Sequence, residues 1–272
     1  MSKATDSRRA GKVWLVGAGP GAADLLTLRA AKLLAEADVV LHDALIGEDV
    51  LALASRAKRI SVGKRCGRHS TAQRFINQQL IHAARRNAVV VRLKGGDPML
   101  FGRAQEEMDA LADAGIDYEV VPGITAASAA CAQLRVSLTR RGLSRAVALL
   151  TPRAGAGESP SQAVRANAEV PTLALYMASH DSMAVAHELL SCGRASDTPV
   201  AIIENASLPS SRECLTTLSG LAARPVSELL GTNGTPDGAV LVMLGEVFRE
   251  VLEQRINQHA PLSRNAPNAA SA

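Results

Sequence analysis

The chain has 272 residues, of which 47% are hydrophobic, 21% charged and 2% aromatic, and its formal net charge is +4. This length predicts one large or two small domains, with a core that needs no disulfides. The few aromatic rings argue against a protein that stacks on single-stranded nucleic acid, and the basic residues form no block of like charge. We therefore expect no nucleic-acid partner.

In the first half of the chain, short apolar runs alternate with helical patterns. Strands are predicted over residues 13–16, 39–41, 60–62, 88–93 and 118–121, and helices over 25–37, 71–86 and 106–114. Strands that alternate with helices are typical of a parallel, doubly wound sheet. We predict an α/β fold whose first domain, residues 12–133, is built on a mainly parallel sheet.

The second half shows a less regular alternation. Strands are predicted over residues 146–150, 172–177, 200–203, 215–218 and 239–244, whereas helices are predicted only over 183–192 and 221–230. This favours a mixed sheet in a second α/β domain, residues 146–256, after an interdomain segment over 134–145. A loop or a poorly packed helix is predicted over residues 153–168. The two ends, residues 1–11 and 257–272, are expected to be disordered tails.

The cysteines and the apolar runs indicate the cellular compartment of the protein. The four cysteines lie far apart and form no C-x-x-C pair, which indicates a reduced protein without a metal. No apolar run approaches the roughly 18 residues of a membrane span, and the polar first residues lack the apolar stretch of a secretion signal. We expect a cytoplasmic protein with no membrane partner.

The first of three glycine-rich loops, residues 16–22, directly follows a predicted strand. It fits the pattern G-x-G-x-x-G/A, with Asp43 some twenty residues further on. A dinucleotide, another nucleotide-like ligand and a purely structural turn are all compatible with this loop. Pro20 argues against the dinucleotide, because it lacks the N–H that a pyrophosphate would use at the start of a helix.

Two more glycine loops follow predicted strands. Residues 92–98 lie where ligands bind in open α/β sheets, although Asp97-Pro98 is also an ordinary turn signal. In residues 121–128, Thr125 is placed to cap a helix, and a simple turn into that helix is the alternative. Three such loops at three strand ends of one domain favour a common binding site.

Specific runs of residues then point to a family. They are Gly17-Ala18-Gly19-Pro20-Gly21, Val62-Gly63-Lys64-Arg65, Val91-Arg92-Leu93-Lys94-Gly95-Gly96-Asp97-Pro98, Phe101-Gly102-Arg103 and Val121-Pro122-Gly123-Ile124-Thr125-Ala126-Ala127-Ser128. Together they resemble the tetrapyrrole methylase family over about residues 11–252. The resemblance implies two α/β domains, a homodimer, and S-adenosyl-L-methionine bound in the cleft between the domains, with S-adenosyl-L-homocysteine as product and no metal.

The runs most resemble the members that methylate uroporphyrinogen III. This implies two successive methyl transfers, to C2 and C7, which give precorrin-2, a precursor of sirohaem and cobalamin. Asp43 aligns with a proposed proton acceptor and Lys64 with a proposed proton donor. The cofactor contacts implied, most of them through the backbone, are Pro20, Gly95, Gly96, Asp97, Leu100, Thr125, Ala126, Met177 and Ala206.

Uroporphyrinogen III carries eight carboxylates, and arginine is well suited to bind them. The candidate substrate-binding residues are Arg65, Arg92, Arg103, Arg140 and Arg141.

The sequence also departs from the family where the substrate is expected. Arg140 and Arg153 stand in place of customary histidines, and Ala44 in place of an arginine. Three alternatives therefore stay open: a sister enzyme that methylates a later precorrin, a weakened paralogue that binds cofactor or tetrapyrrole without catalysis, and an RNA ribose methyltransferase. The last is disfavoured by the scarce aromatic residues.

Overall fold

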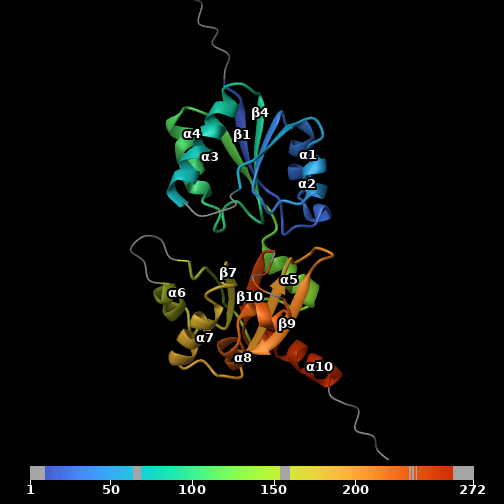
Figure 1. Cartoon of the computed structure of the whole chain (residues 1–272), viewed down its shortest axis with the longest axis vertical. Coiled ribbons are helices and arrows are strands. Elements are labelled where there is room, and N and C mark those ends of the chain that lie inside the picture. Colours follow the sequence, from blue (N-terminus) through green and yellow to red (C-terminus); the bar gives the residue numbers. More distant parts are fainter. Residues whose placement is uncertain are drawn as a thin grey trace, which may run out of the picture.

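The computed structural model describes residues 10–63, 69–153 and 160–259, except positions 233, 235 and 237. It contains two five-stranded sheets, each covered by helices, and the two units are stacked one above the other (Figure 1). The predicted tails fall largely outside the described residues, as do Lys64 and Arg65.

The sheet of the first unit is wholly parallel, as predicted. Its strand order is β3-β2-β4-β1-β5, so β4 lies at the centre, between β2 and β1. The three inner strands, β2, β4 and β1, read as largely apolar runs because helices cover both faces of the sheet, whereas the edge strand β3 is polar and mostly exposed. They are β1 (Lys12–Gly17), β2 (Val39–His42), β3 (Lys58–Ser61), β4 (Val89–Lys94) and β5 (Tyr118–Val121).

Two helices cover each face of this sheet (Figure 1). On one face, α1 (Leu28–Glu36) and α2 (Glu48–Ala52) pack with Val91 and Leu93 of β4. On the other, α3 (His69–Ala84) and α4 (Ala104–Asp113) pack with Val90 of the same strand. Alternate residues of β4 thus serve two separate cores.

The sheet of the second unit is mixed, which confirms the prediction. Its order is β6-β7-β10-β8-β9, and only the β6–β7 pair is parallel. Its strands are β6 (Val147–Leu150), β7 (Thr172–Tyr176), β8 (Pro199–Glu204), β9 (Arg212–Thr217) and β10 (Val240–Leu244).

The helices of the second unit belong to two cores. One core includes side chains of α6 (Pro160–Ala166), α7 (Ser182–Ser191), α8 (Leu218–Ala223) and α9 (Val226–Leu229). The other includes side chains of α5 (Ala126–Leu134), the 3-10 helix η2 (Glu246–Phe248) and α10 (Arg249–His259).

The position of α5 corrects the predicted domain boundary. We expected residues up to 133 to belong to the first domain, but the buried side chains of α5 pack with Ala174, Ala201 and Met243 of the second sheet. The small side chains of this alanine-rich helix allow the close approach. The chain therefore passes between the units after β5, before the segment predicted over 134–145.

Several element boundaries also differ from the prediction. The helix predicted over 221–230 is two short helices, because Pro225 has no N–H for helical bonding. The helix predicted from residue 25 begins at Leu28, after a 3-10 turn, η1 (Ala23–Leu25), and Thr27, whose hydroxyl accepts a hydrogen bond from Ala30 N. The helices α2 and α10 were not predicted.

Candidate active site

The three glycine loops meet at the carboxyl ends of β1, β4 and β5. Gly19 and Gly96 exchange backbone hydrogen bonds of 3.2 and 2.7 Å. A Cβ on Gly123 would lie 2.2 Å from the carbonyl oxygen of Gly96, and one on Gly17 would lie 2.6 Å from Gly123 N. Glycine is thus required at these positions so that the loops can touch one another.

A cavity of about 380 Å³ lies between these loops and the second unit. Its volume is within the range of sites that enclose a cofactor-sized molecule. Of the nine predicted cofactor residues, eight line it: Pro20, Gly95, Gly96, Asp97, Leu100, Thr125, Ala126 and Met177. We refer to it as the interdomain cavity.

Ala206 is the predicted cofactor residue that does not line this cavity. It is buried in the apolar core formed with α5, and its neighbours Asn205 and Leu208 line the cavity instead. The sequence of this loop did not indicate which of its residues line the cavity.

Tyr176 lines the interdomain cavity and was not predicted. Its hydroxyl lies 2.6 Å from Thr125 Oγ1 and accepts a hydrogen bond of 3.2 Å from Ala127 N. The tyrosine therefore satisfies an N–H at the start of α5, while the predicted cap, Thr125, makes no such bond. Burial raises the pKa of Tyr176, which keeps the phenol neutral, and its ring packs against Phe101 at 5.2 Å between centroids.

Left-handed backbone conformations gather around this cavity. Among the described residues, six other than glycine have a positive φ, and five of them lie in or beside the site: Phe101, Arg103, Met177, Asn205 and Ser207. Each such residue costs on the order of 1 kcal/mol, and such strain concentrates at functional sites. Met177, at φ 55°, is turned so that its side chain remains 38% exposed at the cavity.

A second cavity, of about 420 Å³, adjoins the first. The two share Asp43, Leu45, Lys94, Phe101 and Gly102, so they adjoin at these residues. We refer to the second as the basic cavity because, besides Asp43, its charged lining residues are Arg92, Lys94, Arg103 and Arg153.

Asp43 lies at the junction of the two cavities, because it lines both of them. Its Oδ1 accepts a hydrogen bond of 2.6 Å from Arg92 Nη2, and its side chain is 36% exposed. Among the described residues, Oδ2 has no partner. The carboxylate is therefore held at one oxygen, while the other is left without a hydrogen-bond partner in the described part of the chain.

Arg92 differs from its predicted role as a substrate ligand. It is buried, and besides Asp43 it donates to Glu107 and to the carbonyl oxygens of Leu41 and Leu93. These contacts hold the guanidinium inside the protein, where it supports Asp43.

Of the other described arginines that were predicted to bind substrate, one lines the basic cavity and two do not. Arg103 lines the basic cavity and forms an ion pair with Glu106. Arg140 is exposed and pairs with Glu250 of α10, and Arg141 is exposed. Neither lines the basic cavity. Arg153, noted in the sequence only as a departure from the family, does.

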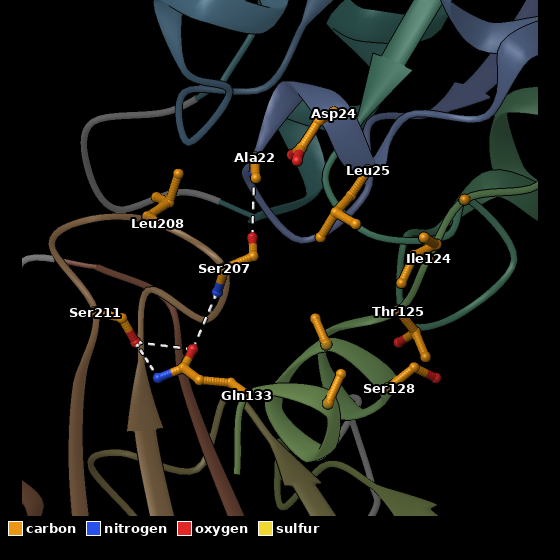
Figure 2. A pocket seen from close by; sticks show the side chains of 13 residues that line it. Ala22, Asp24, Leu25, Ile124, Thr125, Ser128, Gln133, Ser207, Leu208 and Ser211 are labelled. Carbon is orange, nitrogen blue, oxygen red and sulfur yellow. Dashed lines mark hydrogen bonds between the residues drawn. The ribbon is translucent and has the colours of Figure 1, made fainter. Parts of the chain in front are cut away.

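A third, more open cavity of about 830 Å³ lies beside the interdomain cavity (Figure 2). Ser207 Oγ accepts a hydrogen bond of 3.1 Å from Ala22 N, which ties the first glycine loop to the second unit, and Gln133 holds Ser207 and Ser211 from α5. Of the predicted site residues, only Thr125 lines this cavity. We therefore place the site in the other two cavities.

In the described part of the chain, no three His, Cys, Asp or Glu side chains gather as ligands for a metal ion. None of the described helices combines the length and the apolar character that crossing a membrane requires.

The chain matches proteins of one family over most of its length. Residues 12–222 match Tetrapyrrole (Corrin/Porphyrin) Methylases. A uroporphyrinogen-III C-methyltransferase of Pseudomonas aeruginosa is 43% identical over 92% of this chain and 99% of its own length. A siroheme synthase of Psychrobacter sp. is 40% identical over 91% of this chain, which spans only 50% of that protein.

A solved structure agrees with these matches. The uroporphyrin-III C-methyl transferase of Thermus thermophilus, in complex with S-adenyl homocysteine, has a TM-score of 0.73 and 40% identity, over 88% of this chain and all of that one. This chain therefore belongs to the tetrapyrrole methylase family.

Proposed function

We propose that this protein is an S-adenosyl-L-methionine-dependent uroporphyrinogen-III C-methyltransferase that makes precorrin-2 by methylating C2 and then C7. The observation that carries the proposal is the pair of adjoining cavities, one walled by backbone loops and one by cations, which share Asp43 and Lys94. The Pseudomonas and Thermus relatives support it, because both are named for this activity and match along almost their entire chains.

The interdomain cavity fits the cofactor. A Cβ on Gly95 would meet no atom within 4 Å, so the loop leaves open space where a ligand can approach the backbone. Leu100, Phe101 and Met177 add apolar surface to the same cavity. When bound, the cofactor supplies a methyl group activated by its positive sulfur.

The basic cavity fits the substrate. Arg92 and Lys94 are balanced by Asp43 and Glu107. Arg103 pairs with Glu106, so among the described residues the unbalanced positive charge at this cavity comes from Arg153, which favours an anionic ligand over a neutral one. Arg153 comes from the second unit and, among the described residues, forms no ion pair. We infer that Arg103 and Arg153 bind carboxylates of the tetrapyrrole from opposite sides.

The residues at the junction between the cavities lie where the methyl group and the substrate would meet. A substrate held by the arginines presents a pyrrole carbon toward the methyl group, and such positioning accounts for much of the rate in a direct transfer. As the ring carbon gains its methyl group, the ring must give up a proton. The free Oδ2 of Asp43 is positioned to accept it, and Lys64, the expected proton donor, lies outside the described residues.

An assay under anaerobic conditions tests this function. Purified protein is given S-adenosyl-L-methionine with either uroporphyrinogen III or coproporphyrinogen III, which has four carboxylates. We expect methylated product with the first substrate and little with the second. Binding of S-adenosyl-L-homocysteine without methylation of uroporphyrinogen III would favour the sister enzyme or the weakened paralogue instead.

The assembly and the location remain predictions. We propose that the protein forms a homodimer in the cytoplasm, and light scattering on the purified chain checks the dimer.

A further inference from the structure

Four ionisable side chains form one connected chain at the carboxyl end of β4. Glu107 is fully buried, and its carboxylate accepts hydrogen bonds of 2.9 Å from Arg92 Nε and 2.9 Å from Lys94 Nζ. Arg92 continues the chain to Asp43 through a hydrogen bond of 2.6 Å. Two carboxylates thus balance two cations, and of these four groups Arg92, Lys94 and Glu107 are buried while Asp43 is partly exposed.

The local structure explains why these groups meet. Arg92 and Lys94 are two residues apart on β4, so their side chains leave the same face of the sheet. Helix α4 covers that face, and Glu107 lies in its first turn. A single carboxylate on α4 can therefore hold both cations at once.

Three of these four residues line at least one of the two cavities, and Glu107 is the exception. Asp43 and Lys94 line both cavities, whereas Glu107 lines neither. We propose that Glu107 is a positioning residue for methyl transfer. It holds Arg92 so that Asp43 turns Oδ2 toward the junction, and it holds Lys94 so that an ammonium group faces the substrate. The proposal rests on the proposed function.

The charges around Lys94 determine the effect of removing Glu107. Burial is the main cause that lowers the pKa of Lys94 and Arg92 adds to it, while Glu107 and Asp43 raise this pKa. Among the described residues, the other charged or amide side chains that line the basic cavity are Arg103, Arg153 and Gln73. Glu106 pairs with Arg103, and the His42 ring lies beside the backbone of Asp43. Without Glu107, Lys94 loses its nearest anion, so its ammonium is lost at a lower pH.

The test compares Glu107→Gln with the wild-type protein. We expect kcat to fall by about 100-fold, on the scale of lost proton-transfer geometry, while the Kd for S-adenosyl-L-homocysteine stays within about threefold. The alkaline limb of the kcat profile moves to lower pH. An NMR titration of the labelled lysine side chains, assigned with Lys94→Arg, reports the same shift of Lys94 without any substrate.

Matched variants separate positioning from folding. Asp38→Asn removes a carboxylate that accepts the backbone N–H groups of Ala88 and Val89 at the far edge of the sheet, so it should lower stability but leave the pH profile unchanged. Glu107→Asp keeps the charge, so the alkaline limb stays in place while kcat falls. It also carries the test if Glu107→Gln does not fold.

Two outcomes would overturn the proposal. One is a Glu107→Gln protein that is less stable but has unchanged kcat and Lys94 titration. The other is a Glu107→Asp protein with full activity. A wild-type protein that does not methylate uroporphyrinogen III would refute the proposed function, whereas the lysine titration would still test the link between Glu107 and Lys94.

Discussion

Asp97 joins two glycine loops through its carboxylate: Oδ2 accepts a hydrogen bond of 2.9 Å from Gly123 N. The other oxygen accepts one of 2.8 Å from Met99 N, within its own loop. Hydrogen bonds between a charged group and the backbone stabilise by about 1.5–3 kcal/mol each. Asp97 therefore shapes the interdomain cavity by fixing the backbone that lines it.

Replacing Asp97 with asparagine should weaken cofactor binding. The amide keeps one acceptor oxygen but sets a nitrogen, which cannot accept, against one of the two backbone N–H groups. A loss of about 1.4 kcal/mol corresponds to a tenfold higher Kd for S-adenosyl-L-homocysteine, measurable by calorimetry. An unchanged Kd would mean that the two loops hold their shape without Asp97.

Two glycine substitutions should separate loop packing from ligand approach. In Gly123→Ala, the new Cβ would lie 2.2 Å from the carbonyl oxygen of Gly96, so both stability and cofactor binding should fall, the former by about 2 kcal/mol. In Gly95→Ala, the Cβ meets no atom within 4 Å, so the protein should keep its stability and lose only cofactor affinity. Denaturant unfolding and calorimetry measure the two quantities, and equal stability losses would contradict this distinction.

Asp43→Asn should nearly abolish turnover, because the amide oxygen is a poor proton acceptor. Arg92 still finds an oxygen to bind, so the Kd for S-adenosyl-L-homocysteine should stay within about threefold, or less than 1 kcal/mol. Single-turnover methylation and calorimetry on the same sample provide the comparison. If both properties fell together, Asp43 would be holding the cavity rather than accepting a proton.

Arg153→Ala should weaken substrate binding without changing cofactor binding. A partly exposed ion pair contributes up to about 1 kcal/mol, so the Kd for uroporphyrin, a stable octacarboxylate, should rise about fivefold at low salt. The matched control is Arg165→Ala, which removes an exposed arginine that pairs with Glu188 away from the basic cavity. Fluorescence titration measures both, and equal effects would mean that Arg153 contributes only net charge.

Much of the fold could be predicted because its causes are local. Apolar runs such as 88–93 mark buried parallel strands, and the glycine loops lie directly after them. The boundary after β5 could not be predicted, because α5 is nearly apolar all round and its own sequence does not indicate which sheet it packs on. Its partners on the second sheet are far along the chain, and Met243 is more than a hundred residues away.

The positions of the loops that wall the site could be predicted, because they depend on backbone conformation. The positions of the charged side chains could be predicted less well. Eight of the nine residues that the resemblance implies for the cofactor line the interdomain cavity, because most of them belong to the glycine loops that wall it. Whether an arginine is exposed or buried depends on partners elsewhere in the fold. The sequence predicted Arg92 as a substrate ligand, but its guanidinium is bound by Glu107 inside the protein. The position of Arg153 in the basic cavity follows from the structure alone.

The most direct test of the central claim is to count the methyl groups that the purified protein transfers to uroporphyrinogen III. With deuterated methyl donor and no oxygen, mass spectrometry gives the number of labelled methyl groups for each tetrapyrrole, and NMR locates them. A site that binds cofactor and octacarboxylate in adjoining cavities should transfer two, at C2 and C7. No transfer, or transfer to another position, would contradict this account.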